Sequence, residues 1–190
     1  MLFRIGIVLL FGLPVGCASG PSPAPGPRPS SPLTQQDLAL FDDGVDFVSD
    51  PAGLSGGWLQ AWKTELDGRL ARADVVAIVG IASVSRSEQG QDGRRKFVLS
   101  PRTERVVKGN WPDGAPLVSS QGGPGFASLL RGQQRVLEGK YVLFAKWTTA
   151  EDGSVLPRWH LSRVGGAVME LMAQRLGVGP ERTVVIRRTN

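Results

Sequence analysis

His160 is the single histidine of the chain, and most acid–base or nucleophilic mechanisms would depend on it. In a serine hydrolase, His160 would act as the base for a serine nucleophile. The candidate serines are Ser119, Ser120 and Ser128. None of these serines stands in the Gly-x-Ser-x-Gly turn that exposes a nucleophile. Strand alternation places Arg158 and Ser162 on the same face as His160. We therefore predict that His160 is an exposed or hydrogen-bonded strand residue, and that the chain is not an enzyme.

Possible metal ligands are few. One histidine and one cysteine, Cys17, cannot make a structural zinc site, which needs four nitrogen or sulfur ligands. Four aspartates lie close together in the chain, at Asp42, Asp43, Asp46 and Asp50. They lack the spacing and the central glycine of a calcium loop, so we expect them on a solvated helix face. No metal and no other cofactor is predicted.

Two other kinds of site depend on carboxylates or on glycine-rich loops. Glycoside hydrolysis needs two carboxylates in one cleft. The candidates are Glu104, Asp113 and Glu138, and nothing in the sequence brings them together. A hydrolase of envelope polymers therefore stays an alternative. The segment 122–126 reads GGPGF and lacks the Gly-Lys-Ser/Thr ending of a phosphate-binding P-loop.

The N-terminus has the composition of an export signal. Residues 1–4 carry one positive charge, residues 5–13 are almost wholly apolar, and small residues precede Cys17. The apolar run is far shorter than the roughly 20 residues that span a bilayer, so we expect it to be removed. Residues 13–16, Leu-Pro-Val-Gly, resemble the lipobox of bacterial lipoproteins, with Pro14 where an aliphatic residue is usual. The alternative is ordinary cleavage that frees Ser19.

The lipoprotein resemblance implies cleavage before Cys17 and acylation of that cysteine, which would anchor the chain in a membrane. Ala18 after the cysteine, in place of Asp, implies the outer membrane, with the domain facing the periplasm or the cell surface. Residues 20–32 read GPSPAPGPRPSSP and predict an extended spacer that holds the domain away from the membrane. The expected division is a signal over 1–16, a lipidated linker over 17–32, a helical segment over 33–72 and a barrel with a C-terminal helix over 73–190.

Charge is distributed unevenly along the chain. Residues 33–73 contain three basic and seven acidic residues, whereas residues 74–190 contain seventeen basic and ten acidic residues. A basic surface outside the cytoplasm suits an anionic glycan, lipid head groups or an acidic protein as partner, and nucleic acid is not expected in that compartment. Alternatively, the acidic segment packs near the basic one and much of the field cancels.

Apolar residues at spacings of three and four predict three helices, over residues 34–48, 57–72 and 167–176. Thr34 and Asp37 resemble a capping box at the start of the first helix. Trp58 and Trp62 lie on the apolar stripe of the second helix, where we expect both to anchor the core.

Extended, β-branched stretches predict strands over residues 75–85, 95–107, 117–120, 141–147, 156–164 and 183–187. Pro101 inside the second strand implies a bulge or an edge. Residues 121–139 are predicted to form a loop. The expected fold is mainly β with flanking helices, an α+β chain built on a small antiparallel barrel.

Three short motifs carry a resemblance to a known barrel. Ala73-Asp74 leads into a strand with Gly80, residues 106–109 (VVKG) end the next strand, and residues 139–144 (GKYVLF) begin a later one. This order resembles the OB-type barrel of netrin modules and metalloproteinase inhibitors over residues 73–164. The resemblance implies an OB-like barrel of about five strands and opens a protease-inhibitor-like alternative. The zinc-chelating N-terminal cysteine of those inhibitors has no counterpart at the start of this barrel, because Cys17 lies far before it.

Loops on a rigid scaffold often carry binding residues, so the expected 121–139 loop is the best candidate for a binding surface. The alternative is a plain surface loop without a binding role. The candidate contacts are Phe126, Arg131, Arg135 and Arg158. The function predicted is that of a non-enzymatic envelope lipoprotein that binds, or assembles with, a protein or an anionic glycan. A protease-inhibitor-like module and a hydrolase of envelope polymers are the alternatives.

Overall fold

The computed structural model describes residues 27–87, 93–150 and 152–177. The predicted signal, Cys17, most of the proline-rich segment and the strand expected over 183–187 lie outside these residues. Among the helices in the described ranges, none has the length and apolar character needed to cross a bilayer.

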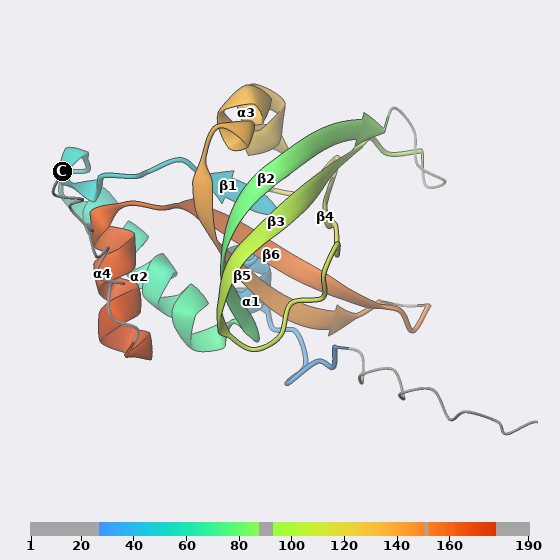
Figure 1. Cartoon of the computed structure of the whole chain (residues 1–190), viewed down its shortest axis with the longest axis horizontal. Coiled ribbons are helices and arrows are strands. Elements are labelled where there is room, and N and C mark those ends of the chain that lie inside the picture. The colour runs from blue at the N-terminus through green and yellow to red at the C-terminus, as the bar shows by residue number, and fades with distance from the viewer. Residues whose placement is uncertain (1–26, 88–92, 151, 178–190) are drawn as a thin grey trace, which may run out of the picture.

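Six strands form one curved sheet that closes almost completely into a barrel (Figure 1). Their order across the sheet is β1-β6-β5-β2-β3-β4. The strands are β1 (Gly44–Asp46), β2 (Val75–Ser87), β3 (Lys96–Lys108), β4 (Leu117–Ser120), β5 (Lys140–Thr149) and β6 (Val155–Arg163). All neighbours are antiparallel except β1 and β6, which are parallel. The expectation of a mainly β barrel with flanking helices is confirmed.

Pro101 was predicted to mark a bulge or an edge of the sheet, and the structure shows both features beside it. The register of β2 against β3 shifts between Ile81 and Ser83, directly beside the pair Ile81–Pro101. On its other side β3 pairs with β4 only over residues 96–99, so Pro101 has no β4 partner. A residue without an N–H is tolerated there because no ladder hydrogen bond depends on it.

The first helix is shorter than predicted. Helix α1 spans Gln35–Leu40 and begins with the expected capping box between Thr34 and Asp37. The chain then leaves helical geometry, with Asp43 in the left-handed region at φ 56°. Val45, expected on the helix face, instead lies in β1 and pairs with Leu161. The segment 33–72 is therefore part helix and part strand, and it contributes one edge of the barrel sheet.

Helix α2 (Gly57–Arg72) confirms the second predicted helix, and α4 (Gly166–Leu176) confirms the last one. The two tryptophans of α2 differ in their environment: Trp62 is 8% exposed and Trp58 is 78% exposed. Trp62 donates a hydrogen bond from its indole to Asp46, at 2.8 Å. Only Trp62 is therefore the core anchor that the spacing predicted for both.

The prediction of a loop over residues 121–139 is wrong, because α3 occupies Phe126–Leu137. The apolar face of α3 consists of Phe126, Leu129 and Val136. It was not recognised in the sequence because glycine and proline at 122–125 precede it and polar residues interrupt it. The helix is irregular at Gly132, where an added Cβ would lie 2.6 Å from the ring of Phe47. Helix α3 packs against β1 and β2 and lies beside them in Figure 1.

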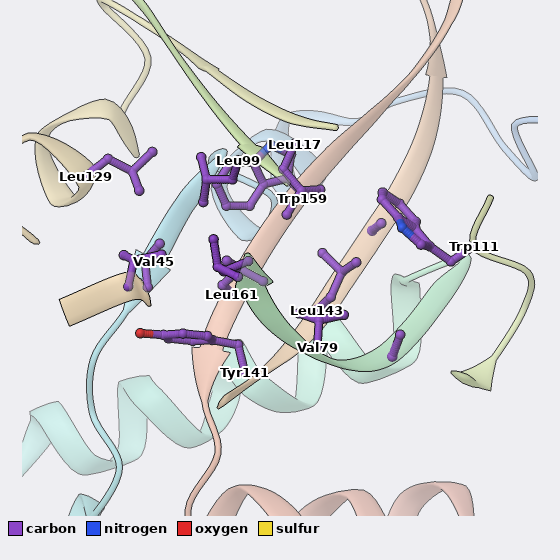
Figure 2. Close-up of a cluster of buried hydrophobic side chains, with 14 of the residues drawn as sticks. Val45, Val79, Leu99, Trp111, Leu117, Leu129, Tyr141, Leu143, Trp159 and Leu161 are labelled. Carbon is purple, nitrogen blue, oxygen red and sulfur yellow. The ribbon is translucent and has the colours of Figure 1, made fainter. Parts of the chain in front are cut away.

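Two apolar clusters stabilise the fold. The first fills the barrel and includes Tyr141, Leu143, Trp159 and Leu161, which are drawn as sticks in Figure 2. The second lies between the sheet and the helices α1, α2 and α4, and its largest members are Phe41, Leu66, Leu70 and Phe144. Burial of each such side chain contributes about 1.5–3 kcal/mol. The sheet is thus covered on both faces along β5 and β6.

Candidate functional site

His160 lies in a buried ionic cluster between β6 and the segment that precedes α2. It is 4% exposed, and its Nδ1 lies 2.8 Å from Oδ1 of Asp42. Its Nε2 is buried and has no hydrogen-bond partner among the described residues. Burial, together with the positive charge of Arg69, lowers the pKa of His160. The predicted hydrogen-bonded form is therefore present, and the ring lies inside the protein.

Asp43 and Arg158 make the second half of this cluster. Arg158 Nη1 lies 2.6 Å from Asp43 Oδ2, and the backbone N–H of Trp159 donates to Oδ1 at 3.1 Å. Burial raises the pKa of Asp43 to about 7, although Arg158 and the Trp159 N–H oppose the shift. The aspartates at 42 and 43 are thus structural partners of β6. The expectation that they lie on a solvated helix face is wrong.

The glycine-rich segment 122–125 packs directly against this cluster. The N–H of Gly125 donates to the carbonyl of Asp42 at 3.0 Å. An added Cβ at Gly125 would lie 2.3 Å from the nitrogen of Gly44, and one at Gly44 would lie 2.7 Å from the Cα of Gly125. Both positions need glycine because two backbones touch there. The start of α3 therefore packs directly against β1 through this segment.

The serines considered as nucleophiles are not hydrogen-bonded to His160. Ser128 donates to the carbonyl of Gly125 at 2.7 Å and accepts from the N–H of Val45 at 3.1 Å. Ser119 is fully buried in β4, and its hydroxyl has no partner among the described residues. Glu104 pairs with Lys140 at 2.9 Å, whereas Asp113 lies in the turn before β4 and Glu138 at the end of α3. The geometry assembles no triad from these residues.

The four predicted binding residues are not brought together. Phe126 is 8% exposed and packs on Phe97, with ring centroids 4.9 Å apart, so it is a core residue. Arg131 and Arg135 are exposed on α3, where the guanidinium of Arg135 lies 4.4 Å above the ring of Phe47. Arg158 is held by Asp43 on β6. The helix that replaces the expected loop turns Phe126 inward because its apolar face must be buried.

A different basic surface emerges where the described chain begins. A groove of about 620 Å³ is lined by Arg28, Arg72, Lys108 and Lys146, with Asp74 as its one acidic residue. The rest of the lining is Pro27, Ser30, Ser31, Ala71, Ala73, Val75, Asn110 and Trp147. These residues come from the proline-rich segment, the end of α2, the end of β3 and the middle of β5. We call this surface the basic groove.

Hydrogen bonds hold the wall of the basic groove in place. Ser31 accepts from Lys146 Nζ at 2.9 Å, and Ser30 donates to Asp74. Asp74 also accepts from the N–H of Trp147 at 2.9 Å. The last residues of the predicted spacer therefore lie against the barrel, and do not extend freely to residue 32 as expected.

The cations of the groove differ in how far they are neutralised. Arg72 pairs with buried Asp37 at 3.2 Å. The pKa of Asp37 is lowered even though burial opposes this, because Thr34 hydrogen bonds and the charges of Lys146 and Arg72 favour its carboxylate. Arg28 and Lys108, in contrast, make no side-chain ion pair or hydrogen bond within the described ranges. The groove therefore presents uncompensated positive charge.

Sequence reasoning missed this groove because its residues are far apart in the chain. One signal was available: Lys146 interrupts the apolar strand YVLFAKW and is 3% exposed in the structure. A lysine in a run that is buried on both faces needs a nearby acceptor or counter-charge. That requirement points to the end of the barrel where Asp37, Asp74 and Ser31 lie.

A second groove, of about 600 Å³, runs between α2 and α4. Its lining includes Trp62 and three carboxylates, Asp50, Asp67 and Glu170. Arg175 bridges the two helices through a two-point ion pair with Asp67, at 2.5 and 2.7 Å. Asp50 accepts from the N–H of Ala52 at 2.9 Å and caps the 3-10 turn Pro51–Gly53. Glu170 accepts from Gln174 Nε2 at 3.3 Å, so all three carboxylates hold hydrogen bonds.

Comparisons with protein families, with curated proteins and with solved structures find no match to this chain.

Proposed function

We propose that the chain is an envelope-anchored, non-enzymatic binding module that takes an anionic partner in the basic groove. The supporting observation is the groove itself, with four cations around one acidic residue in about 620 Å³. Arg28 and Lys108 are its uncompensated charges. A site of this size and charge suits a phosphate, sulfate or carboxylate group of an envelope component.

The delivery part of the proposal rests on the sequence. Residues 13–17 resemble a lipobox, so Cys17 would be acylated and the chain held at the outer membrane. This places the groove near envelope glycans, lipids and proteins, and away from nucleic acid. Intact-mass measurement of the membrane fraction, beside a Cys17→Ser variant, tests it: the acyl mass should be present only in the parent chain.

The OB-type resemblance also enters here as a proposal. The five antiparallel strands follow the order β6-β5-β2-β3-β4, with α3 between β4 and β5. An OB-type barrel is a five-stranded Greek-key barrel that often binds oligosaccharides or oligonucleotides. Barrels of this kind host many functions, so the fold supports binding in general and the groove supports the class of ligand.

A binding assay with a matched pair of polymers tests the function. The parent chain should bind dextran sulfate and not uncharged dextran, and added salt should weaken the binding because it screens charge. A charge-reversed groove variant, Arg28→Glu with Lys108→Glu, should bind dextran sulfate more weakly by at least about 2 kcal/mol.

Two comparison variants sharpen the assay. Lys63→Glu with Arg102→Glu makes the same change in net charge at exposed positions outside the groove, and should keep most of the binding. Arg131→Glu with Arg135→Glu tests the surface predicted from sequence. If only this last variant loses binding, the site is on α3 and the groove proposal is wrong.

A hydrolase of envelope polymers is a second candidate, favoured by the carboxylates of the α2–α4 groove. Glu170 and Asp50 both line that groove, and Glu170 makes no ion pair within the described ranges. Hydrolysis of purified cell-wall glycan by the parent chain, abolished in Glu170→Gln and in Asp50→Asn, would establish this activity. Equal, background rates in all three proteins would eliminate it.

A further inference from the structure

We propose that the basic groove binds the phosphate-bearing head groups of anionic phospholipids, so that this end of the barrel lies on the membrane that anchors the chain. The inference rests on the proposed function, from which it takes the anchor at Cys17 and the groove as binding site. It narrows the anionic partner of the proposed function to one class, the anionic phospholipids.

The contact of residues 27–31 with the basic groove favours a lipid surface over a distant ligand, because these residues follow the predicted anchor at Cys17. Pro27 and Arg28 form part of the groove wall, and Ser30 and Ser31 are hydrogen-bonded to the barrel beside them. Only about ten residues separate Cys17 from Pro27, which in an extended proline-rich chain reach about 30 Å. An acylated Cys17 therefore keeps the groove close to the bilayer, and it connects to the domain at the groove itself.

The side chains in the groove match the chemistry of a phosphodiester. Arg28 and Lys108 supply charge that no described residue neutralises, and long cationic side chains extend readily toward head groups. Ser31 and Asn110 line the same surface and offer polar hydrogen-bonding groups. A phosphodiester carries strong acceptor oxygens that take up both kinds of donor.

The groove also has an apolar wall that suits the glycerol part of a lipid. Trp147 lines it and stacks on Trp111, with ring centroids 5.5 Å apart and an interplanar angle of 19°. Stacking and burial hold the Trp147 ring in place, since it is only 5% exposed. The wall is therefore preorganised, and binding requires ordering of only two side chains, the exposed Arg28 and the half-buried Lys108.

The test measures the reactivity of Lys108 toward an amine-acetylating reagent, with the full chain as a bacterial host exports it. Vesicles of phosphatidylcholine alone are compared with vesicles that contain phosphatidylglycerol. Lys63, an exposed lysine of α2, is the internal control. We expect Lys108 to be acetylated at least about fivefold more slowly with phosphatidylglycerol, since each cation near an anionic surface contributes about that factor in affinity. The Lys63 rate should not change.

Three further arms make the result decisive. High salt should remove the protection, because screening shortens the range of attraction. The Arg28→Glu variant should lose most of it, whereas Arg102→Glu should keep it. Soluble glycerol phosphate is the last arm: if it protects Lys108 as well as the vesicles do, the partner is free phosphate and the membrane proposal is wrong.

Equal Lys108 rates on both kinds of vesicle would overturn the inference. The outcome is separable from failure of the proposed function. Dextran sulfate binding that persists while Lys108 stays unprotected by phosphatidylglycerol would retain an anionic-ligand site and exclude the lipid. The intact mass of the same sample shows whether Cys17 is acylated. If it is not, the chain is mixed with the same vesicles, and the proposal still requires slower acetylation of Lys108 with phosphatidylglycerol.

Discussion

The barrel interior and the layer between the sheet and the segment 33–72 are both buried, but they are built from different chemistry. Apolar and aromatic side chains such as Tyr141, Leu143 and Trp159 fill the barrel (Figure 2). The other layer adds buried polar and charged groups to its apolar contacts, namely Asp37, Asp43, Arg69, Lys146 and His160. One region depends mainly on the hydrophobic effect and the other also on directional bonds.

This difference assigns the two regions different roles. Apolar burial is non-directional and provides most of the stability of a barrel. Buried ion pairs gain little net stability against their desolvation cost, but their breakage is costly, and they define geometry. Here they define where the chain between α1 and α2 docks. Asp42, Asp43 and Asp46 each bond to a partner outside their own turn, at His160, Arg158 and Trp62.

The largest effect is expected in the barrel interior. Trp159→Ala should lower the free energy of unfolding by about 4 kcal/mol, because it removes a fully buried indole and its hydrogen bond to the carbonyl of Val118, 3.0 Å long. Urea unfolding followed by circular dichroism measures it. A loss below about 1 kcal/mol would show that the interior relaxes around the gap and does not dominate stability.

The contact between the two regions at Gly125 comes next. Gly125→Ala should cost about 2–3 kcal/mol, since the added Cβ would meet the Gly44 backbone at 2.3 Å. Gly53→Ala is the matched control, because an added Cβ there meets nothing within 4 Å. The difference between the two urea midpoints is the measurement. Equal midpoints would mean that α3 and β1 separate at little cost.

The contributions of His160 and Asp43 to the free energy of unfolding should change with pH in opposite directions. The lowered pKa of His160 makes its contribution to stability complete above pH 6.5, and that contribution is lost as pH falls. The pKa of Asp43, raised to about 7, acts the other way: its contribution is present below pH 3.8 and is lost as pH rises toward 7. In the parent chain the two contributions therefore oppose each other in the slope of the free energy of unfolding against pH.

Single variants should separate these slopes. Between pH 4 and 6.5, Asp43→Asn should gain stability with rising pH, and His160→Gln should lose it, each by up to about 1.4 kcal/mol per pH unit. Urea unfolding across that range provides the data. Slopes of the same sign in both variants would contradict the opposite shifts, and variants of the barrel interior should leave the parent slope unchanged.

The smallest effect is expected outside both regions. Trp58→Ala should change the free energy of unfolding by less than about 0.5 kcal/mol, because the side chain is 78% exposed. Trp62→Ala, one helical turn later on the same stripe, should cost about 3 kcal/mol through lost burial and the lost bond to Asp46. Thermal unfolding of the pair measures the contrast, and similar losses would place Trp58 in the core.

Local pattern predicted the elements of the barrel and failed where tertiary contacts compete with it. Alternation and β-branched residues located β2 to β6, since those signals act within each strand. The spacing of Phe41, Val45 and Val48 equally suited a helix, and only the pairing of Val45 with Leu161 decided for β1. Helix α3 was missed because glycine and polar residues mask an apolar face that becomes evident only against Phe97 and Phe47.

The sequence by itself determined the class of fold, the capping box at Thr34, the helices predicted at 57–72 and 167–176, and the bulge at Pro101, because each depends on residues near one another in the chain. It could not determine that His160 is buried against Asp42, or that Arg28, Arg72, Lys108 and Lys146 share one groove. These facts depend on contacts between residues that are from 30 to more than 100 positions apart, and only the closed sheet brings them together.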